Sequence, residues 1–100
     1  MALLANKTAI VTGASSGIGR AIALKFAAEG SSIVVADTVE QPIEGGESTV
    51  DRIRSAGGTA IYIRTDISDW NAVDALVGAT VAQFGRLDVM VNNAAIYTST

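Results

Sequence analysis

Four short runs of mostly β-branched and other apolar residues place the strongest constraint on how this 100-residue chain can fold. They lie at residues 8–11, 32–36, 59–64 and 87–91. The segments between them carry the three- and four-residue apolar spacing of helices, at residues 17–29, about 47–56 and 68–84. Strands of continuous apolar character that alternate with helices indicate a parallel sheet covered on both faces.

The order β-α-β-α-β-α-β predicts an α/β fold, a Rossmann-type doubly wound parallel sheet. Right-handed crossovers favour the strand order 3-2-1-4 for its first four strands. The fourth strand would then be an apolar sheet edge, which folded proteins usually cover or pair. We therefore expect residues 1–100 to be the first, truncated part of a larger single domain. A small domain that pairs with a second copy is the alternative.

The helices also carry expectations about individual side chains. Ser68 is predicted to be the N-cap of the third helix, with Asp69 in its first turn. The apolar residues of that helix recur at steps of three and four and predict a stripe facing the core: Trp70, Val73, Val77, Val81 and Phe84. In the first helix the same spacing places three residues on one face: Ile18, Ile22 and Phe26.

Composition excludes several kinds of chemistry. The chain has no cysteine and no histidine, which rules out disulfides, thiolate metal sites and Ser-His-Asp or Cys-His catalysis within it. Its 7 basic and 10 acidic residues give a net charge of −3, which argues against a nucleic-acid partner. The start resembles no secretory signal, and no apolar run approaches the roughly 18 residues of a membrane span. We expect a cytoplasmic protein.

A glycine-rich turn, Thr12 to Gly19, joins the first strand to the first helix. Gly13 lets the chain turn out of the strand, Gly17 lets backbone approach a phosphate, and Gly19 lets the helix pack on the strand. The N–H groups and positive dipole end of the helix favour an anion there. The placement predicts dinucleotide binding, and a tight turn used only for packing is the alternative. Arg20-Ala21 follows the turn, which excludes a Walker A loop.

Asp37 ends the second strand, 18 residues after Gly19. A carboxylate near this offset can accept hydrogen bonds from both hydroxyls of an adenosine ribose and would repel a 2′-phosphate. Ser16 and Thr38 nearby are uncharged. We therefore predict NAD rather than NADP as the coenzyme. The alternative is an aspartate that only ends the strand and caps the loop.

Together these residues resemble the short-chain dehydrogenase/reductase family, over essentially the whole chain. Thr12 to Gly19 is similar to its TGxxxGxG turn, Asp66-Ile67 to its adenine-contacting pair, and Asn92 to Ala95 to its NNAG element, with alanine in place of the final glycine. The resemblance implies that the Asp66 carboxylate accepts from the adenine amino group and the Ile67 N–H reaches a ring nitrogen. The predicted coenzyme-binding residues are Gly13, Ser15, Ser16, Gly17, Ile18, Gly19, Asp37, Asp66, Ile67, Asn93, Ala94 and Ala95.

The resemblance implies an NAD-dependent oxidoreductase that transfers a hydride between the nicotinamide and a secondary alcohol or carbonyl compound. The family's catalytic Tyr-x-x-x-Lys is not found, because Tyr62 is followed at the fourth position by Asp66 and Tyr97 has no lysine after it in residues 98–100. We therefore assign no catalytic residue and no metal ligand. The chain would supply the coenzyme-binding half and be inactive alone. The family usually forms tetramers or dimers. A non-catalytic dinucleotide-binding or sensing module is the main alternative, and a methyltransferase is a weaker one.

Overall fold

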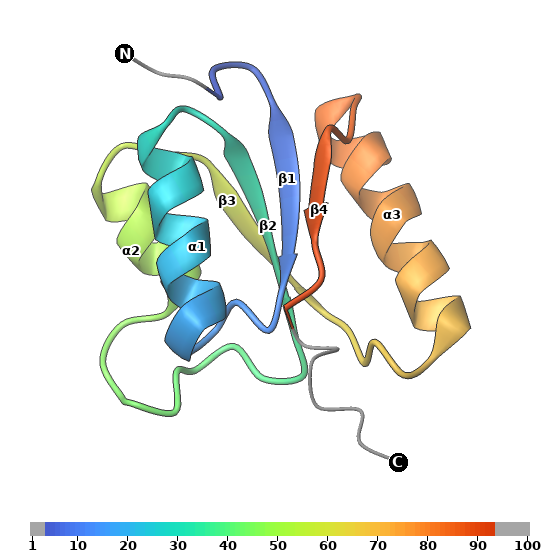
Figure 1. The fold of residues 1–100 in the computed structure, drawn as a ribbon, viewed down its shortest axis with the longest axis horizontal. Coiled ribbons are helices and arrows are strands. Elements are labelled where there is room, and N and C mark those ends of the chain that lie inside the picture. The colour runs from blue at the N-terminus through green and yellow to red at the C-terminus, as the bar shows by residue number, and fades with distance from the viewer. Residues whose placement is uncertain (1–3, 94–100) are drawn as a thin grey trace.

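The computed structural model describes residues 4–93 and contains one four-stranded parallel sheet. The sheet has the order β3-β2-β1-β4, which confirms the predicted fold class and strand order (Figure 1). The elements are β1 (Thr8–Thr12), α1 (Gly17–Ala28), β2 (Ser32–Asp37), α2 (Thr49–Ser55), β3 (Ala60–Arg64), α3 (Trp70–Phe84) and β4 (Val89–Val91).

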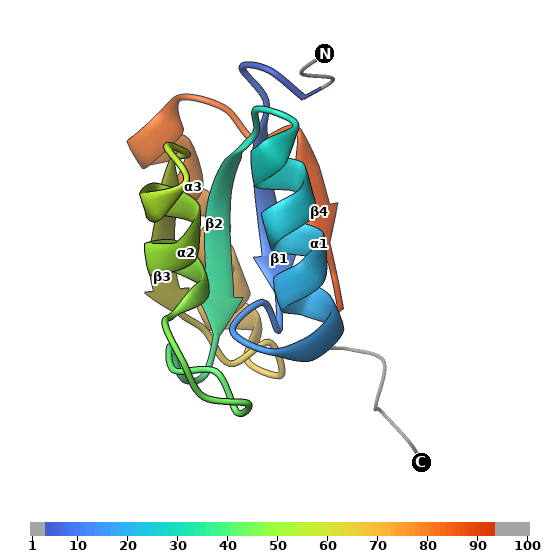
Figure 2. The ribbon, with the colours of Figure 1, turned by 90° about the vertical axis from the view of Figure 1, so that its left-hand side faces the viewer.

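The helices cover both faces of the sheet, with α1 and α2 on one side and α3 on the other (Figure 2). Successive strand residues point to opposite faces, so β1 supplies both layers of the core. Ala9 and Val11 lie in the cluster beneath α1 and α2, while Ile10 joins Leu76 of α3 in the second cluster. The continuous apolar character of the central strands follows from this burial on both sides.

The N-cap of α3 differs from the prediction by one residue. Asp69, not Ser68, is the N-cap, and its Oδ1 accepts from the N–H groups of Asn71 at 2.9 Å and Ala72 at 3.4 Å. Ser68 is engaged elsewhere, because its N–H and its hydroxyl both donate to Oδ1 of Asp66, at 3.0 and 2.7 Å. The Asp69 carboxylate, one position later, therefore caps the helix.

The core-facing stripe predicted for the third helix is wrong at two of its members. Trp70 is 84% exposed and Val81 is 43% exposed. The helix instead rests on the sheet side through Leu76 and Thr80, both fully buried. At about 100° per residue, Trp70 and Val81 lie about 120° and 140° around the helix from Leu76, which places them on its flank.

A similar difference affects the first helix, where Ile18 is 68% exposed. Ile22 and Phe26 do pack partly against the core. Ile18 lies in the first turn, directly after the glycine turn, where the helix begins at the end of the sheet. The shared face predicted for the three residues is therefore buried only from Ile22 onward.

Asp88 ties the start of β4 to β1. Its Oδ2 accepts from the Thr8 N–H at 2.8 Å, and its own N–H donates to the Thr8 carbonyl at 2.9 Å. Arg86 donates two further hydrogen bonds to this carboxylate, both at 2.7 Å. The hydrogen bonds from Arg86 and then from Thr8 lower the pKa of Asp88 from 3.8 to about 2. The strand accordingly begins after this clamp, at Val89 rather than at residue 87.

Candidate functional site

A hollow of about 230 Å³ opens at the edge of the sheet where β1, β2 and β3 end. In open α/β sheets ligands bind outside the carboxyl ends of the strands, where the strand order reverses, and here it reverses at β1. Four of the predicted coenzyme-binding residues line this hollow: Gly13, Asp37, Asp66 and Ile67. Ala36, Thr38 and Thr65 complete its lining.

The glycine turn forms one wall and has a backbone that requires glycine. Gly13 and Gly17 have φ values of 64° and 57°, in the left-handed region that L side chains rarely adopt. The Gly13 N–H donates to the Ala36 carbonyl at 2.8 Å, which fixes the turn to the end of β2. A Cβ built on Gly19 would lie 2.7 Å from the Gly13 carbonyl carbon and 2.8 Å from Asn93 Nδ2. The close packing predicted for Gly19 is therefore present.

The turn is also supported from α2, by a contact that the sequence analysis missed. The Thr49 hydroxyl is buried and donates to the Ala14 carbonyl at 2.7 Å. The Arg20 guanidinium in turn donates to the Thr49 hydroxyl oxygen at 3.0 Å. These bonds link the start of α2 to the turn and to the first turn of α1. They support the glycine turn, which forms one wall of the hollow, from two helices.

Asp37 is held by hydrogen bonds to both its side chain and its backbone. Its Oδ2 accepts from the Ser15 N–H at 3.1 Å and its Oδ1 from the Thr38 N–H at 2.7 Å. Its carbonyl accepts from the Thr65 N–H at 2.9 Å and from the Tyr62 hydroxyl at 3.0 Å. The Thr38 bond also fits the loop-capping alternative, so the ribose contact stays a prediction.

Tyr62, which is not among the predicted coenzyme-binding residues, supports Asp37 from β3. It pairs with Val35 in the parallel register of β2 and β3, which brings its hydroxyl to the Asp37 carbonyl. Burial raises the pKa of the Tyr62 phenol, and the negative charge of Asp37 raises it further. The phenol therefore stays protonated and donates to Asp37 at neutral pH.

Asp66 and Ile67 follow β3 on the far side of the hollow. Both hydrogen bonds from Ser68 go to Oδ1 of Asp66 and hold the carboxylate at the start of the loop. The Ser68 hydroxyl and then the Ser68 N–H lower the pKa of Asp66 below its usual 3.8. Asp66 is thus an exposed, ionised acceptor beside the half-buried Ile67. Their contact with an adenine ring stays a prediction.

The residues after β4 lie beside the glycine turn. The Thr12 hydroxyl donates to Asn92 Oδ1 at 3.2 Å and to the Val91 carbonyl at 3.3 Å, which joins the ends of β1 and β4. The distance from Asn93 Nδ2 to a Cβ on Gly19 places Asn93 against the start of α1. Ala94 and Ala95, also predicted coenzyme contacts, lie outside the described residues.

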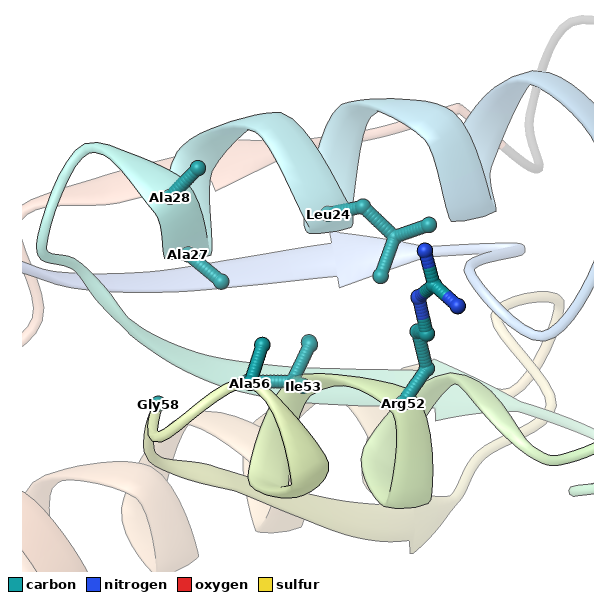
Figure 3. A pocket seen from close by; sticks show the side chains of 7 residues that line it. All are labelled: Leu24, Ala27, Ala28, Arg52, Ile53, Ala56 and Gly58. Carbon is teal, nitrogen blue, oxygen red and sulfur yellow. The ribbon is translucent and has the colours of Figure 1, made fainter.

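A second hollow, of about 250 Å³, lies between α1 and α2 (Figure 3). Most of its lining is aliphatic or glycine, with Arg52 as the charged side chain: Leu24, Ala27, Ala28, Arg52, Ile53, Ala56 and Gly58. Its position toward the end of α1 separates it from the carboxyl edge of the sheet. We therefore place the candidate site at the smaller hollow, where the polar groups converge.

Within residues 4–93, no three His, Cys, Asp or Glu side chains gather in a group that could hold a metal ion. None of the helices in the same range combines the length and the apolar character needed to cross a membrane.

Known proteins resemble the chain over nearly its whole length. The family profile described as short chain dehydrogenase matches residues 7–100. An uncharacterized oxidoreductase of Methylorubrum extorquens is 45% identical over 97 residues, covering 97% of this chain and 38% of the relative. The L-rhamnose 1-dehydrogenase (NAD(P)(+)) of Azotobacter vinelandii is 44% identical over 95 residues, covering 94% and 37%. A short chain dehydrogenase from Mycobacterium avium has a TM-score of 0.83 and 42% identity, covering 93% and 34%.

The chain spans little more than a third of the length of these curated relatives. The profile match nevertheless includes all four strands, the glycine turn and the residues that line the carboxyl-edge hollow. The resemblance inferred from the sequence is therefore confirmed. The chain belongs to the short-chain dehydrogenase family, whose members bind a nicotinamide coenzyme.

Proposed function

We propose that residues 1–100 are the coenzyme-binding, N-terminal part of a Rossmann-fold domain in an NAD-dependent oxidoreductase. The complete enzyme would transfer a hydride between the nicotinamide and the carbon of a secondary alcohol or carbonyl compound. The observation that carries this proposal is the Asp37 carboxylate, which lines the hollow between the glycine turn and Asp66. We further propose a homo-oligomeric, cytoplasmic enzyme, as the sequence analysis expects.

The residues of the site fit the adenosine diphosphate half of a dinucleotide. The hollow offers two carboxylates, Asp37 and Asp66, and an adenosine offers hydroxyl and amino donors to match them. The half-buried Ile67 gives apolar surface for the flat ring. The start of α1 next to the hollow directs backbone N–H groups and a positive dipole end toward a diphosphate.

The charge of the hollow favours NAD over NADP. A phosphate monoester carries a charge of about −1.5 to −2 at neutral pH. Among the described residues that line the hollow, two are acidic and none is basic. A 2′-phosphate placed at Asp37 would therefore meet a like charge without a cation to balance it. The Azotobacter relative is named for both NAD and NADP, so family membership alone does not select one coenzyme.

The chain's own part in the reaction would be to bind and orient the coenzyme. The bound nicotinamide supplies the hydride exchange, and the protein supplies orientation and electrostatics. Asp37 would fix the ribose, Asp66 and Ile67 the adenine, and the start of α1 the diphosphate. The remaining proposed contacts are those predicted from the sequence: Gly13, Ser15, Ser16, Gly17, Ile18, Gly19, Asn93, Ala94 and Ala95.

The Asp37→Ala variant tests the proposal, with Asp74→Ala as a control that removes the same charge from an exposed position of α3. Loss of a charge-assisted hydrogen-bond pair should cost about 1.5–3 kcal/mol of NADH binding, or roughly 10- to 150-fold in Kd. NADH and NADPH are titrated by nucleotide fluorescence on purified protein. We expect weaker NADH binding and reduced discrimination against NADPH in Asp37→Ala alone. Unchanged NADH affinity in that variant would show that Asp37 does not hold the ribose.

A further inference from the structure

The connection between β2 and α2 is bound to the start of α1 by two hydrogen bonds. The Ile43 N–H donates to Ser16 Oγ at 2.7 Å, and the Gly17 N–H donates to Glu44 Oε2 at 3.1 Å. Ser16 is the N-cap of α1, yet in the part of the chain that the structure describes its side chain makes no hydrogen bond to that helix. Glu44, 27 residues away, supplies the acceptor at the first helical N–H instead.

Glu44 is thus the second carboxylate, after Asp37 at the end of β2, to bind the glycine turn. Asp37 accepts from the Ser15 N–H, and Glu44 accepts from the Gly17 N–H two residues further on. Two residues of chain span at most about 7 Å. Each carboxylate oxygen lies 3.1 Å from its N–H, so the two oxygens are at most about 13 Å apart. This separation is well inside the Debye length of about 30 Å at 0.01 M salt, so at low salt both charges act on a group that binds at Asp37.

Glu44 carries its charge at neutral pH. A hydrogen bond from its own backbone N–H, followed by that from Gly17, lowers the pKa of the Glu44 carboxyl below its usual 4.5. Arg20 is the cation that acts on it, but only weakly, and the Arg20 guanidinium is hydrogen-bonded to Thr49. The negative charge at the start of α1 is therefore not neutralised by an ion pair among those found in residues 4–93.

We propose that Glu44 is a specificity-determining residue that acts with Asp37 to exclude the 2′-phosphate of NADP from the adenosine end of the site. This inference rests on the proposed function, because it takes the ribose to lie at Asp37. NAD and NADP both place a diphosphate at the start of α1, so repulsion between Glu44 and that group is common to the two coenzymes and cancels in the ratio of their dissociation constants. NADP adds a charge of about −1.5 to −2, which a second nearby carboxylate repels.

Glu44 could instead weaken the binding of both coenzymes by competing with their diphosphate, and the two roles predict different affinities when its charge is removed. If its carboxylate only competes with the coenzyme diphosphate for the Gly17 N–H, removing the charge strengthens NAD and NADP binding equally, because both carry that diphosphate. If it discriminates between them, NADP gains more than NAD does. The ratio of the two dissociation constants therefore separates discrimination from competition.

The test is the Glu44→Gln variant, whose amide oxygen can still accept from the Gly17 N–H while the charge is lost. Glu47→Gln is the matched control. Glu47 is an exposed acid of the same connection, but it faces Arg52 at 3.8 Å. NADH and NADPH are titrated into wild type and both variants at low and high salt.

We expect Glu44→Gln to shift the ratio of the two dissociation constants about three- to tenfold in favour of NADPH at low salt, on top of any gain that both coenzymes share through the diphosphate. High salt should shrink this shift. Glu47→Gln should change neither affinity. Equal gains for both coenzymes, or no gain for NADPH, would overturn the role of Glu44 and leave the proposed function standing. A wild type that binds NADPH as tightly as NADH would overturn the proposed function and this inference with it.

Discussion

Replacing Gly19 by alanine probes how tightly α1 is packed on the glycine turn. The added Cβ would lie 2.7 Å from the Gly13 carbonyl carbon, would contact the Gly13 carbonyl oxygen, and would lie 2.8 Å from Asn93 Nδ2. Carbon atoms in contact are normally about 3.5–4.0 Å apart. The Gly13 atoms belong to backbone that is hydrogen-bonded to Ala36, so they cannot rotate away. The turn or the helix must shift by about 1 Å.

The expected cost follows from two opposing effects. Overpacking costs about 1–3 kcal/mol. Alanine in place of glycine in a helix recovers about 0.5–1 kcal/mol. Because two of the three clashing atoms are backbone, we expect the overpacking to prevail. The Gly19→Ala protein should lose on the order of 1–2 kcal/mol in its free energy of unfolding.

Gly78 provides the matched control, since it is an exposed glycine within α3. Of the described residues, none would come within 4 Å of a Cβ at Gly78. Gly78→Ala should therefore gain about 0.5–1 kcal/mol from helix propensity alone. Urea unfolding followed by far-ultraviolet circular dichroism measures both variants. Equal stabilisation of the two variants would refute the close contact between Gly19, Gly13 and Asn93.

Two further predictions concern α3 and β4. Asp69→Ala should lower the free energy of unfolding by about 1 kcal/mol, because α3 loses its N-cap. Ser68→Ala should lower it by less. Urea titrations measure both variants, and a larger loss in Ser68→Ala would contradict the assignment of Asp69 as the N-cap. Asp88 has its pKa lowered to about 2, so the stability it contributes is present above pH 4 and is lost as pH falls from about 4 to 2. Asp88→Asn should lose stability at pH 7 and show a flatter pH dependence across that window; an unchanged slope would contradict the clamp.

The architecture could be predicted because burial on both faces leaves a plain pattern in the sequence. Ile10 faces α3 while Val11 faces α1 and α2, so consecutive β1 residues must all be apolar. The glycine turn then identifies β1, and the right-handed crossovers restrict where the other strands can lie. The apolar pattern and the glycine turn are local features, and the handedness of crossovers is a general rule of topology, so all three can be applied to a single sequence.

The orientation of α3 could not be predicted in the same way. Its apolar residues extend around more than one face, so periodicity alone does not say which of them meets the sheet. Leu76 and Thr80 are buried because the strands beneath them set the rotation of the helix, and Trp70 is left outside. Asp69 takes the N-cap because Asp66 has already engaged Ser68.

The site was predicted where its residues follow strand ends and missed where they are brought in from elsewhere. Asp37 is the last residue of β2, Asp66 follows shortly after β3, and both line the hollow. Glu44, Thr49 and Tyr62 contact residues 25–35 positions away in the sequence. The parallel register of β2 and β3, had it been known, would have identified Tyr62 as a neighbour of Asp37. No local sequence pattern identifies Glu44, in its irregular loop, as a neighbour of the glycine turn.

Comparative titration of NADH and NADPH into the unmodified protein tests the central claim most directly. Nucleotide fluorescence gives both dissociation constants under one set of conditions. Because two carboxylates and no basic side chain line the described part of the hollow, we predict NADH binding at least about tenfold tighter than NADPH binding. Tighter or equal binding of NADPH, or binding of neither nucleotide, would contradict the assignment of this site to NAD.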